Sequence, residues 1–251
     1  KQNFEKRLTK FEEIFHNAEN YFHSWNFEQA ISKYKEAIEL NIDNQKCERR
    51  ISDAKYKIKR LKELEEKRRE KERIEKEIRE KYKDDAEAIV QYFKRNGIYE
   101  FYHYTDTRNL NSILQHGGLF SLNKMNARGI NYQQGSETFE MPDYVRLSYS
   151  KNHPLLYVSK NQGRILKEKI LYIDLEIAKL RKTKFTNVNA ARTSNPPTVK
   201  IGEDLEFIKQ NVKLNIVKQP NHFNLSEEDK PYYQAEIMVK DHVEMEYIKN
   251  L

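Results

Sequence analysis

One carboxylate stands in an otherwise apolar stretch close to the C-terminal end of the sequence. The run from Tyr233 to Val239 is expected to form a strand, on which Gln234 and Glu236 share a face and lie about 7 Å apart. A fixed carboxylate can stabilise a developing positive charge or remove a proton, and an amide can donate and accept hydrogen bonds. A glutamate on a strand is also common in surface ion pairs, so the residue type alone leaves both roles open.

A histidine between aromatic residues is the second candidate. Phe101 to Asp106 reads F-Y-H-Y-T-D, and the helix expected from Thr107 to Gln115 is ended by Gly117-Gly118. His103 is therefore expected on a strand that leads into a short helix. Histidines on strands are often ordinary core or edge residues, so the role of His103 depends on the motifs around it.

Several common cofactor signatures are absent from the sequence. It has no clustered Cys/His set, no G-x-x-x-x-G-K phosphate loop and no H-E-x-x-H metal motif. A dinucleotide-binding G-x-G-x-x-G is absent too, so an enzyme that uses NAD would need another way of binding it. We therefore expect no metal cofactor.

Four segments, in order, resemble the DarT family of ADP-ribosyltransferase toxins. Phe101 to Leu119 is similar to the family's aromatic-His-aromatic-Thr strand and the helix N-L-x-x-I-L-x-x-G that follows it. Asp143 to Tyr157 resembles the D-Y-V strand and its downstream P-x-L-Y, and Phe185 to Ala191 resembles the loop F-T/S-D-x-N-A. Tyr233 to Ile248 resembles the Q-A-E strand with V-x-x-E-Y-I after it. The resemblance implies an α+β fold, with a β-rich, ADP-ribosyltransferase-like catalytic domain that uses NAD as co-substrate.

The first segment supplies residues that the resemblance assigns to NAD. His103 would hold the adenine-side ribose, and Thr105 or its backbone would help to fix the nicotinamide end. Asn109, which opens the helical part of the motif, is assigned to the same binding set.

The second segment adds a cation and an aromatic ring. Arg146 could neutralise the pyrophosphate of NAD, and Tyr149 could offer a flat face on which nicotinamide stacks. The sequence has Leu147-Ser148 where the family usually has an aromatic pair. The stacking partner is therefore open between Tyr149, Tyr157 and Tyr144.

The resemblance makes Glu236 the catalytic carboxylate. Breaking the glycosidic bond to nicotinamide creates an oxocarbenium-like ribose, which a carboxylate can stabilise while it holds the 2′-hydroxyl. The same carboxylate could take a proton from an attacking base nitrogen or exocyclic amine. Gln234 would then suit the edge of a nucleobase.

Arg128 is the candidate for a second catalytic residue, because the family has an arginine in the loop before the D-Y-V strand. Arg146 competes for this role. Arg128 and Gln134 could instead belong to a loop that covers NAD or the acceptor.

The third segment lies in a basic stretch. Between Lys160 and Arg192, nine Lys or Arg stand against three acids, a local excess that can attract phosphates, although it could equally be solvated surface. Asn187, Asn189 and Arg192 are therefore assigned to the acceptor nucleic acid.

We expect transfer of ADP-ribose from NAD to a base of single-stranded nucleic acid, with DNA as the first expectation, by a toxin or phage-defence effector. Base-edge nitrogens must be unpaired to attack, and some of the 16 Tyr and 12 Phe could stack bases. RNA is the nearest alternative acceptor, and protein follows. A catalytically inactive module that binds NAD or nucleic acid is the alternative from another class.

The elements ahead of these motifs are expected to be helical. Apolar residues recur at helical spacing from Phe11 to Leu40, around a break at Asn26, and this hairpin resembles one tetratricopeptide repeat. It could dock an antitoxin or another protein, or act as a cap or dimerisation element. Glu48 to Lys83 has many acids four residues before a base, which indicates a solvated helical spacer.

We therefore expect three parts: a hairpin over 1–47, a spacer over 48–98 and the catalytic domain over 99–251. Strands are expected at Glu100–Tyr104, Tyr144–Tyr149, Leu155–Ser159, Ile170–Asp174, Asn215–Val217 and Tyr233–Val239.

The composition sets the remaining bounds. The 251 residues carry a net charge of +7, and basic and acidic groups nearly balance both in residues 1–98 and in residues 99–251, so a whole-domain basic field is not expected. The single Cys47 excludes an internal disulfide and fits a reducing compartment. No apolar run approaches the roughly 18 residues of a membrane span, and the start of the sequence has no signal-peptide core, so we expect a cytoplasmic protein without membrane contact.

Overall fold

The computed structural model describes residues 2–133, 141–192 and 197–251. The described chain divides into two compact units, Lys1–Glu77 and Ile78–Leu251. Each unit has its own buried apolar cluster, so each is described by itself.

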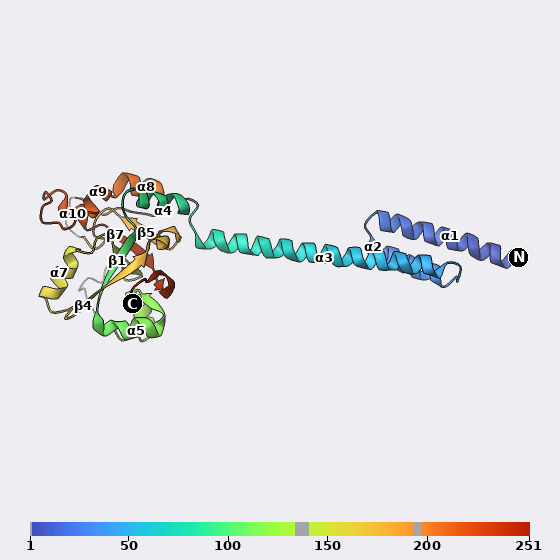
Figure 1. The fold of residues 1–251 in the computed structure, drawn as a ribbon, viewed down its shortest axis with the longest axis horizontal. Helices are drawn as coiled ribbons and strands as arrows, with labels where there is room; N and C mark the ends of the chain where they lie inside the picture. Colours follow the sequence, from blue (N-terminus) through green and yellow to red (C-terminus); the bar gives the residue numbers. More distant parts are fainter. Residues whose placement is uncertain (1, 134–140, 193–196) are drawn as a thin grey trace. The chain divides into compact units, whose positions relative to one another are not determined.

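The first unit is helical and contains the expected hairpin. Helices α1 (Gln2–His23) and α2 (Phe27–Ile38) pack against each other, with fully buried Ala18, Ala30 and Ala37 allowing a close approach (Figure 1). Glu19 of α1 accepts hydrogen bonds from Tyr34 of α2 and, at 2.6 Å, from Nε of Arg50. Arg50 belongs to α3 (Asn44–Lys81), so one half-buried carboxylate joins the three helices.

Helix α3 becomes a solvated helix beyond the hairpin. Among its residues, all of which the structure describes, Cys47 and Ala54 are the buried ones. Ion pairs such as Arg69 with Glu65 at 2.6 Å run along its surface, as the spacing of acids and bases predicts.

The second unit is built on an antiparallel sheet. Among the residues that the structure describes, six strands form this sheet in the order β4-β1-β3-β7-β5-β6, and β2 pairs with β8 separately. The strands are β1 (Glu100–Asp106), β2 (Gly118–Phe120), β3 (Tyr144–Ser148), β4 (Glu168–Asp174), β5 (Thr183–Thr186), β6 (Ile201–Gly202), β7 (Glu236–Lys240) and β8 (His242–Glu244). The expected α+β class is confirmed.

The core of this unit begins earlier in the sequence than expected. Helix α4 (Ala86–Arg95) buries Ile89, Val90 and Phe93 in the same cluster as the central strands, and α8 (Leu205–Asn211) and α9 (Leu214–Val217) lie beside it over the sheet (Figure 1). Residues 84–98, which were expected to belong to the spacer, therefore pack with the second unit. The apolar face of α4 joins the core of this unit, whereas the charged segment ahead of it stays in solvent.

Three expected strands differ in the structure. Leu155–Ser159 lies in helix α7 (Pro154–Asn161), because His153 caps this helix and Pro154 starts it, and Asn215–Val217 lies in α9. The run from Tyr233 begins in helix α10 (Lys230–Tyr233), and its strand starts only at Glu236. Short apolar runs do not distinguish a buried strand from a buried helix, so this domain is less β-rich than expected.

Short elements complete the unit. They are η1 (Thr107–Asn109), α5 (Leu110–His116), α6 (Leu122–Ala127), η2 (Leu175–Lys179) and η3 (Met245–Tyr247). Gly117 ends α5 with a φ of 81°, as the sequence predicts for a glycine after a helix.

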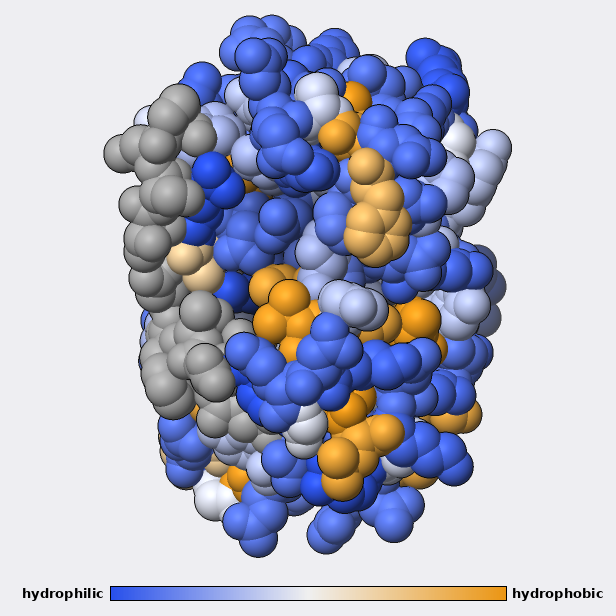
Figure 2. Space-filling model, turned by 90° about the vertical axis from the view of Figure 1, so that its left-hand side faces the viewer, coloured by the Kyte–Doolittle hydropathy of each residue, from blue (hydrophilic) through white to orange (hydrophobic). Residues whose placement is uncertain are grey.

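The outside of this unit is largely polar. Figure 2 shows the end of the molecule that lies on the left in Figure 1: hydrophilic side chains cover most of this face, and apolar ones form separate patches. In the described part of the chain, no helix is both long enough and apolar enough to cross a membrane.

Candidate active site

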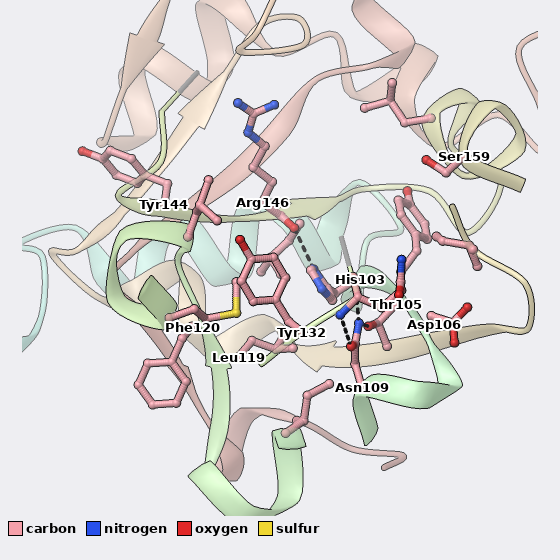
Figure 3. A pocket seen from close by; sticks show the side chains of 18 of the residues that line it. His103, Thr105, Asp106, Asn109, Leu119, Phe120, Tyr132, Tyr144, Arg146 and Ser159 are labelled. Atoms are coloured by element: carbon pink, nitrogen blue, oxygen red, sulfur yellow. Dashed lines mark hydrogen bonds between the residues drawn. The ribbon is translucent and has the colours of Figure 1, made fainter. Parts of the chain in front are cut away.

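The site is formed where two neighbouring strands separate. In the described residues, β1 and β3 pair at a single position, Tyr102 with Ser148, whereas β1 pairs with β4 along its whole length. Beyond that pair the strands diverge. A cavity of about 290 Å³ lies between them, lined by His103 to Asp106 of β1 and by Tyr144, Arg146 and Leu147 of β3 (Figure 3).

The side chain of His103 bridges the gap between the strands. Its Nδ1 lies 3.0 Å from the carbonyl oxygen of Arg146 (Figure 3). A carbonyl oxygen only accepts, so Nδ1 carries the hydrogen. Burial lowers the pKa of His103, against the opposing effect of that bond, so the ring is neutral near pH 7 and its Nε2 is an acceptor. The imidazole is thus prepared to accept a hydrogen bond from a hydroxyl group in the cavity.

Glu236 is a buried carboxylate at the wall of the same cavity. It is 3% exposed and lies opposite Ser148 on the neighbouring strand. Its Oε2 accepts a 2.8 Å hydrogen bond from the backbone N–H of Ala190, and its own N–H donates to Oγ1 of Thr186 at 2.8 Å. Burial raises the pKa of Glu236, while the charge of Arg146 and the Ala190 N–H act in the opposite direction.

Arg146 therefore influences both candidate residues. Its carbonyl holds His103, and its charge acts on Glu236. In Figure 3 its guanidinium points away from His103. This orientation follows from strand alternation, because Arg146 lies on the same face of the sheet as Met238 and Glu236.

Asn109 holds one wall of the cavity in place. Its Nδ2 donates to Oγ1 of Thr105 and to the carbonyl of Gln133, both at 3.0 Å, and its Oδ1 accepts from the N–H of Gln133 at 2.7 Å. These bonds hold Tyr132, another lining residue, beside β1 (Figure 3). Both amide hydrogens of Asn109 are thus used by the fold, and Thr105 is 6% exposed.

An apolar wall, which the sequence did not indicate, faces these polar groups. It includes Leu119, Phe120, Leu122, Met125, Ile130 and Met141. Phe120 stacks on His242, with ring centroids 4.2 Å apart, and the guanidinium of Arg128 lies 4.5 Å from the centroid of the Phe120 ring.

Arg128, the sequence candidate for a second catalytic residue, is not among the described residues that line the cavity, whereas Arg146 is.

The three aromatic candidates for stacking lie in different places in the structure. Tyr149 is 5% exposed and packs in the core, with its ring centroid 5.5 Å from that of Phe101, and Tyr157 is 63% exposed on α7. Neither is among the described residues that line this cavity, and Tyr144 is. The assignment of Tyr149 and Tyr157 to this cavity is therefore corrected, because the chain turns Tyr149 to the core face of the sheet.

The placement of Gln234 is also corrected. It caps the end of α10 with φ −93° and ψ 15°, so it does not share a strand face with Glu236. The strand begins three residues later than the sequence pattern indicated, at Glu236 instead of Tyr233.

The loop after β5 has a role that the sequence analysis missed. Asn187 is buried and its side chain bonds the carbonyl of Thr198 and the N–H of Lys200, while Asn189 accepts from Ala191. These bonds shape the loop that presents Ala190 to Glu236. Arg192 follows in the same loop, its N–H bonded to the carbonyl of Asn189; Gln134 lies outside the described residues.

No group of three or more His, Cys, Asp or Glu side chains that could hold a metal ion occurs within residues 2–133, 141–192 and 197–251.

The second unit matches one known protein family in sequence. The family model described as ssDNA thymidine ADP-ribosyltransferase, DarT, matches residues 102–251. No curated protein matches the chain.

Parts of solved structures are similar to part of this chain. "Thermus sp. 2.9 DarT in complex with carba-NAD+" is 18% identical, with 60% of this chain and 80% of that chain covered and a TM-score of 0.48. "Thermosipho africanus DarTG in complex with ADP-ribose" is 20% identical, with 60% and 43% covered and a TM-score of 0.47. "Thermus sp. 2.9 DarT in complex with ADP-ribosylated ssDNA" is 17% identical, with 61% and 79% covered and a TM-score of 0.45.

The buried charge of Glu236 leads to a prediction about stability. Because its pKa is raised in the folded state, the folded protein holds the Glu236 proton more strongly than the unfolded one, and ionisation destabilises the fold as pH rises. Glu236→Gln keeps an acceptor for Ala190 and removes the charge. At pH 7 we expect the melting temperature of this variant to equal or exceed that of the wild type by up to a few degrees, since 1 kcal/mol of stability corresponds to about 2–4 °C. In acid, where Glu236 is protonated in both states, the two proteins should melt at the same temperature.

Glu244 provides the control of opposite sign. Burial acts to raise its pKa, but hydrogen bonding to Lys182 and nearby charges lower it overall, so its ionised form stabilises the fold at neutral pH and this contribution is lost in acid. Glu244→Gln should therefore melt below wild type at pH 7. A Glu236→Gln variant that melts several degrees below wild type at pH 7 would contradict the inferred cost of this charge.

Proposed function

Because the chain belongs to the DarT family of NAD-dependent ADP-ribosyltransferases, we propose that it transfers ADP-ribose from NAD to a thymine base of single-stranded DNA. The observation that carries this proposal is the buried carboxylate of Glu236 at the wall of a cavity that also contains His103. The family description supplies the acceptor, and the geometry supports the chemistry.

We assign NAD to the cavity between β1 and β3. Nε2 of His103 accepts a hydrogen bond from a ribose hydroxyl, as its tautomer favours. Arg146 supplies the positive charge for the pyrophosphate, and Tyr144 takes the stacking role for which Tyr149 and Tyr157 lie in the wrong place. The apolar wall around Phe120 excludes water from the uncharged rings of NAD.

In the proposed reaction, the bond between C1′ of the ribose and the nicotinamide nitrogen breaks, and nicotinamide leaves with the electron pair. Glu236 stabilises the oxocarbenium-like ribose and accepts the proton of the attacking nitrogen. Its raised pKa suits a general base, because a carboxylate that binds protons more strongly removes them more readily. A bond between the base nitrogen and C1′ completes the transfer.

The chemistry of thymine accounts for the single-strand requirement. In DNA the N1 nitrogen of thymine carries the deoxyribose, so N3 is the ring nitrogen that has a proton to lose. In a duplex this N–H is paired with adenine and buried in the stack, where C1′ cannot approach it. Modification at that edge would block base pairing, which fits the proposed action as a toxin or defence effector.

The first unit is proposed to bind an antitoxin or another protein partner rather than to take part in the reaction. All the residues assigned to catalysis lie in the second unit. The hairpin presents exposed Trp25, at 65% exposure, at the turn between α1 and α2. Aromatic residues of this kind are frequent in protein interfaces.

The acceptor can be tested directly with labelled NAD. We expect label on single-stranded oligonucleotides that contain thymine, little on duplex DNA of the same sequence, and loss of labelling by more than tenfold in Glu236→Gln, since the charge facing the oxocarbenium is gone. Labelling of RNA or of protein in preference to DNA would replace the proposed acceptor. Equal labelling of duplex and single strand would argue against attack by the base edge.

The role of His103 can be separated from its structural role by two substitutions. His103→Asn can keep a donor for the Arg146 carbonyl but lacks the Nε2 acceptor, whereas His103→Ala loses both. Loss of one hydrogen bond to ligand predicts NAD affinity about 2- to 10-fold weaker in both variants, measured by calorimetry, with a melting temperature closer to wild type in the Asn variant. If His103→Asn binds NAD as tightly as the wild type does, His103 has only a structural role.

The independence of the second unit predicts where the chain can be shortened. Removing residues 1–77 should leave transfer to short oligonucleotides intact. Removing residues 1–83 should instead destabilise the unit, because Arg181 bonds the carbonyls of Arg79 and Lys81, and buried Lys83 donates to Ala178. Comparing melting and transfer in the two truncations tests this boundary; a folded but inactive 78–251 fragment would mean that the first unit contributes to the reaction.

A further inference from the structure

We infer that a second cavity, which shares no described lining residue with the first, holds a nucleotide of the acceptor strand one or two positions from the reacting base. This inference rests on the proposed function and adds a site that selects the sequence around the acceptor. The second cavity has a volume of about 290 Å³. Its walls come from three segments, at 97–102, 149–152 and 217–220.

One residue that lines this cavity, Tyr149, carries a buried hydroxyl without a partner in the described part of the chain. Tyr149 is 5% exposed, and its hydroxyl has no hydrogen-bond partner among the residues that the structure describes. Its ring is held between Phe93 and Phe101, with centroids 5.9 and 5.5 Å away, so it cannot turn to solvent. Burial raises the pKa of Tyr149, so the hydroxyl keeps its proton and can donate it to a ligand. Buried polar groups of this kind normally have a partner.

The rim of the cavity carries the groups that bind a nucleotide. Tyr99 is 65% exposed and offers a ring on which a base can stack. Lys151 and Lys218, both exposed, come from different segments and can contact a phosphate. Lys151 lies 5.5 Å from the centroid of Tyr102 and 4.5 Å from that of Tyr172, so its ammonium group is held over two rings at the cavity wall.

One acidic residue gives this site a preference between bases. Glu100 lines the cavity and accepts a hydrogen bond from the hydroxyl of Tyr102 at 3.1 Å. A carboxylate accepts but does not donate, so a second bond to it must come from a base nitrogen that carries hydrogen. Cytosine, adenine and guanine carry an exocyclic amino group with two hydrogens, whereas thymine offers only its single ring N3–H. We therefore expect thymine to be the least favoured base at this position.

The distance between the cavities fits neighbouring nucleotides. Ser148 lines the first cavity opposite Glu236, and Ser150, two residues further, lines the second. Two residues span at most about 7 Å, and stacked nucleotides follow one another at about 3.4 Å along a strand. The linking segment is fixed, because the carbonyl of Ser150 accepts from Ser148 Oγ at 3.0 Å and from the Tyr104 hydroxyl at 3.1 Å. A strand with its reacting base at Glu236 can therefore place a neighbour in the second cavity.

The test uses the full chain and a set of single-stranded oligonucleotides that carry one thymine acceptor and differ in the flanking bases. Tyr99→Ala should raise the KM for DNA about tenfold, as expected for the loss of base stacking, and Lys218→Ala should raise it several-fold. Glu100→Gln should reduce the discrimination against a flanking thymine. Hydrolysis of NAD without DNA should stay at the wild-type rate in all three variants, and DNA binding without NAD, measured by fluorescence anisotropy, should weaken in parallel with the rise in KM.

Two substitutions outside both cavities serve as matched controls. Tyr157→Ala removes a tyrosine of similar exposure, 63%, from α7, and Lys209→Ala removes an exposed lysine from α8. Both should keep the wild-type KM and the same preference for flanking bases.

If Tyr99→Ala, Lys218→Ala and Glu100→Gln behave like these controls while the wild type modifies single-stranded DNA, the second site is refuted and the proposed function stands. If the wild type modifies no single strand, the proposed function itself fails. Competition by free deoxycytidine monophosphate as strong as that by an oligonucleotide would assign the cavity to a free nucleotide and overturn the inference.

Discussion

The divergence of β1 from β3 beyond the pair Tyr102 and Ser148 is the constraint on which the rest of the site depends. Backbone groups that leave a sheet ladder need other partners, because a buried group without one is costly. His103 supplies such a partner to the carbonyl of Arg146. His103, which joins β1 to β3 where their pairing has ended, is thus the residue proposed to bind NAD. A change at His103 is therefore expected to affect both the stability of this part of the sheet and the binding of NAD.

The carboxylate at the wall of this cavity is controlled by burial, by a neighbouring strand and by the loop after β5. Glu236 starts β7, and residues Thr186 and Ala190 hold its backbone and its side chain. Burial raises its pKa, and the fold limits that rise with one N–H group and the charge of Arg146. A carboxylate tuned in this way remains basic while it lies out of water, which is the combination that proton removal next to a cationic ribose requires.

Much of the architecture followed from the sequence because the signals were local. Helical periodicity predicted the hairpin, alternating acids and bases predicted the solvated part of α3, and Gly117 predicted the end of α5. The order and spacing of four motifs indicated the family and the α+β class. The motifs also selected His103 and Glu236, which the fold brings to one cavity from strands more than a hundred residues apart.

The tertiary structure alone decided which neighbours of these two residues reach the cavity. A strand that starts at Glu236 instead of Tyr233 removes Gln234 from its face. The core position of Tyr149 leaves Tyr144 as the one of the three stacking candidates that lines the cavity. Phe120 and Tyr132 carried no motif, because packing places them there. The sequence by itself determined the helical hairpin, the charged helix, the family and two principal residues, since these depend on local periodicity and spacing. The start of a strand, the face that a side chain takes and the separation of β1 from β3 depend on long-range packing, so only the folded chain determines them.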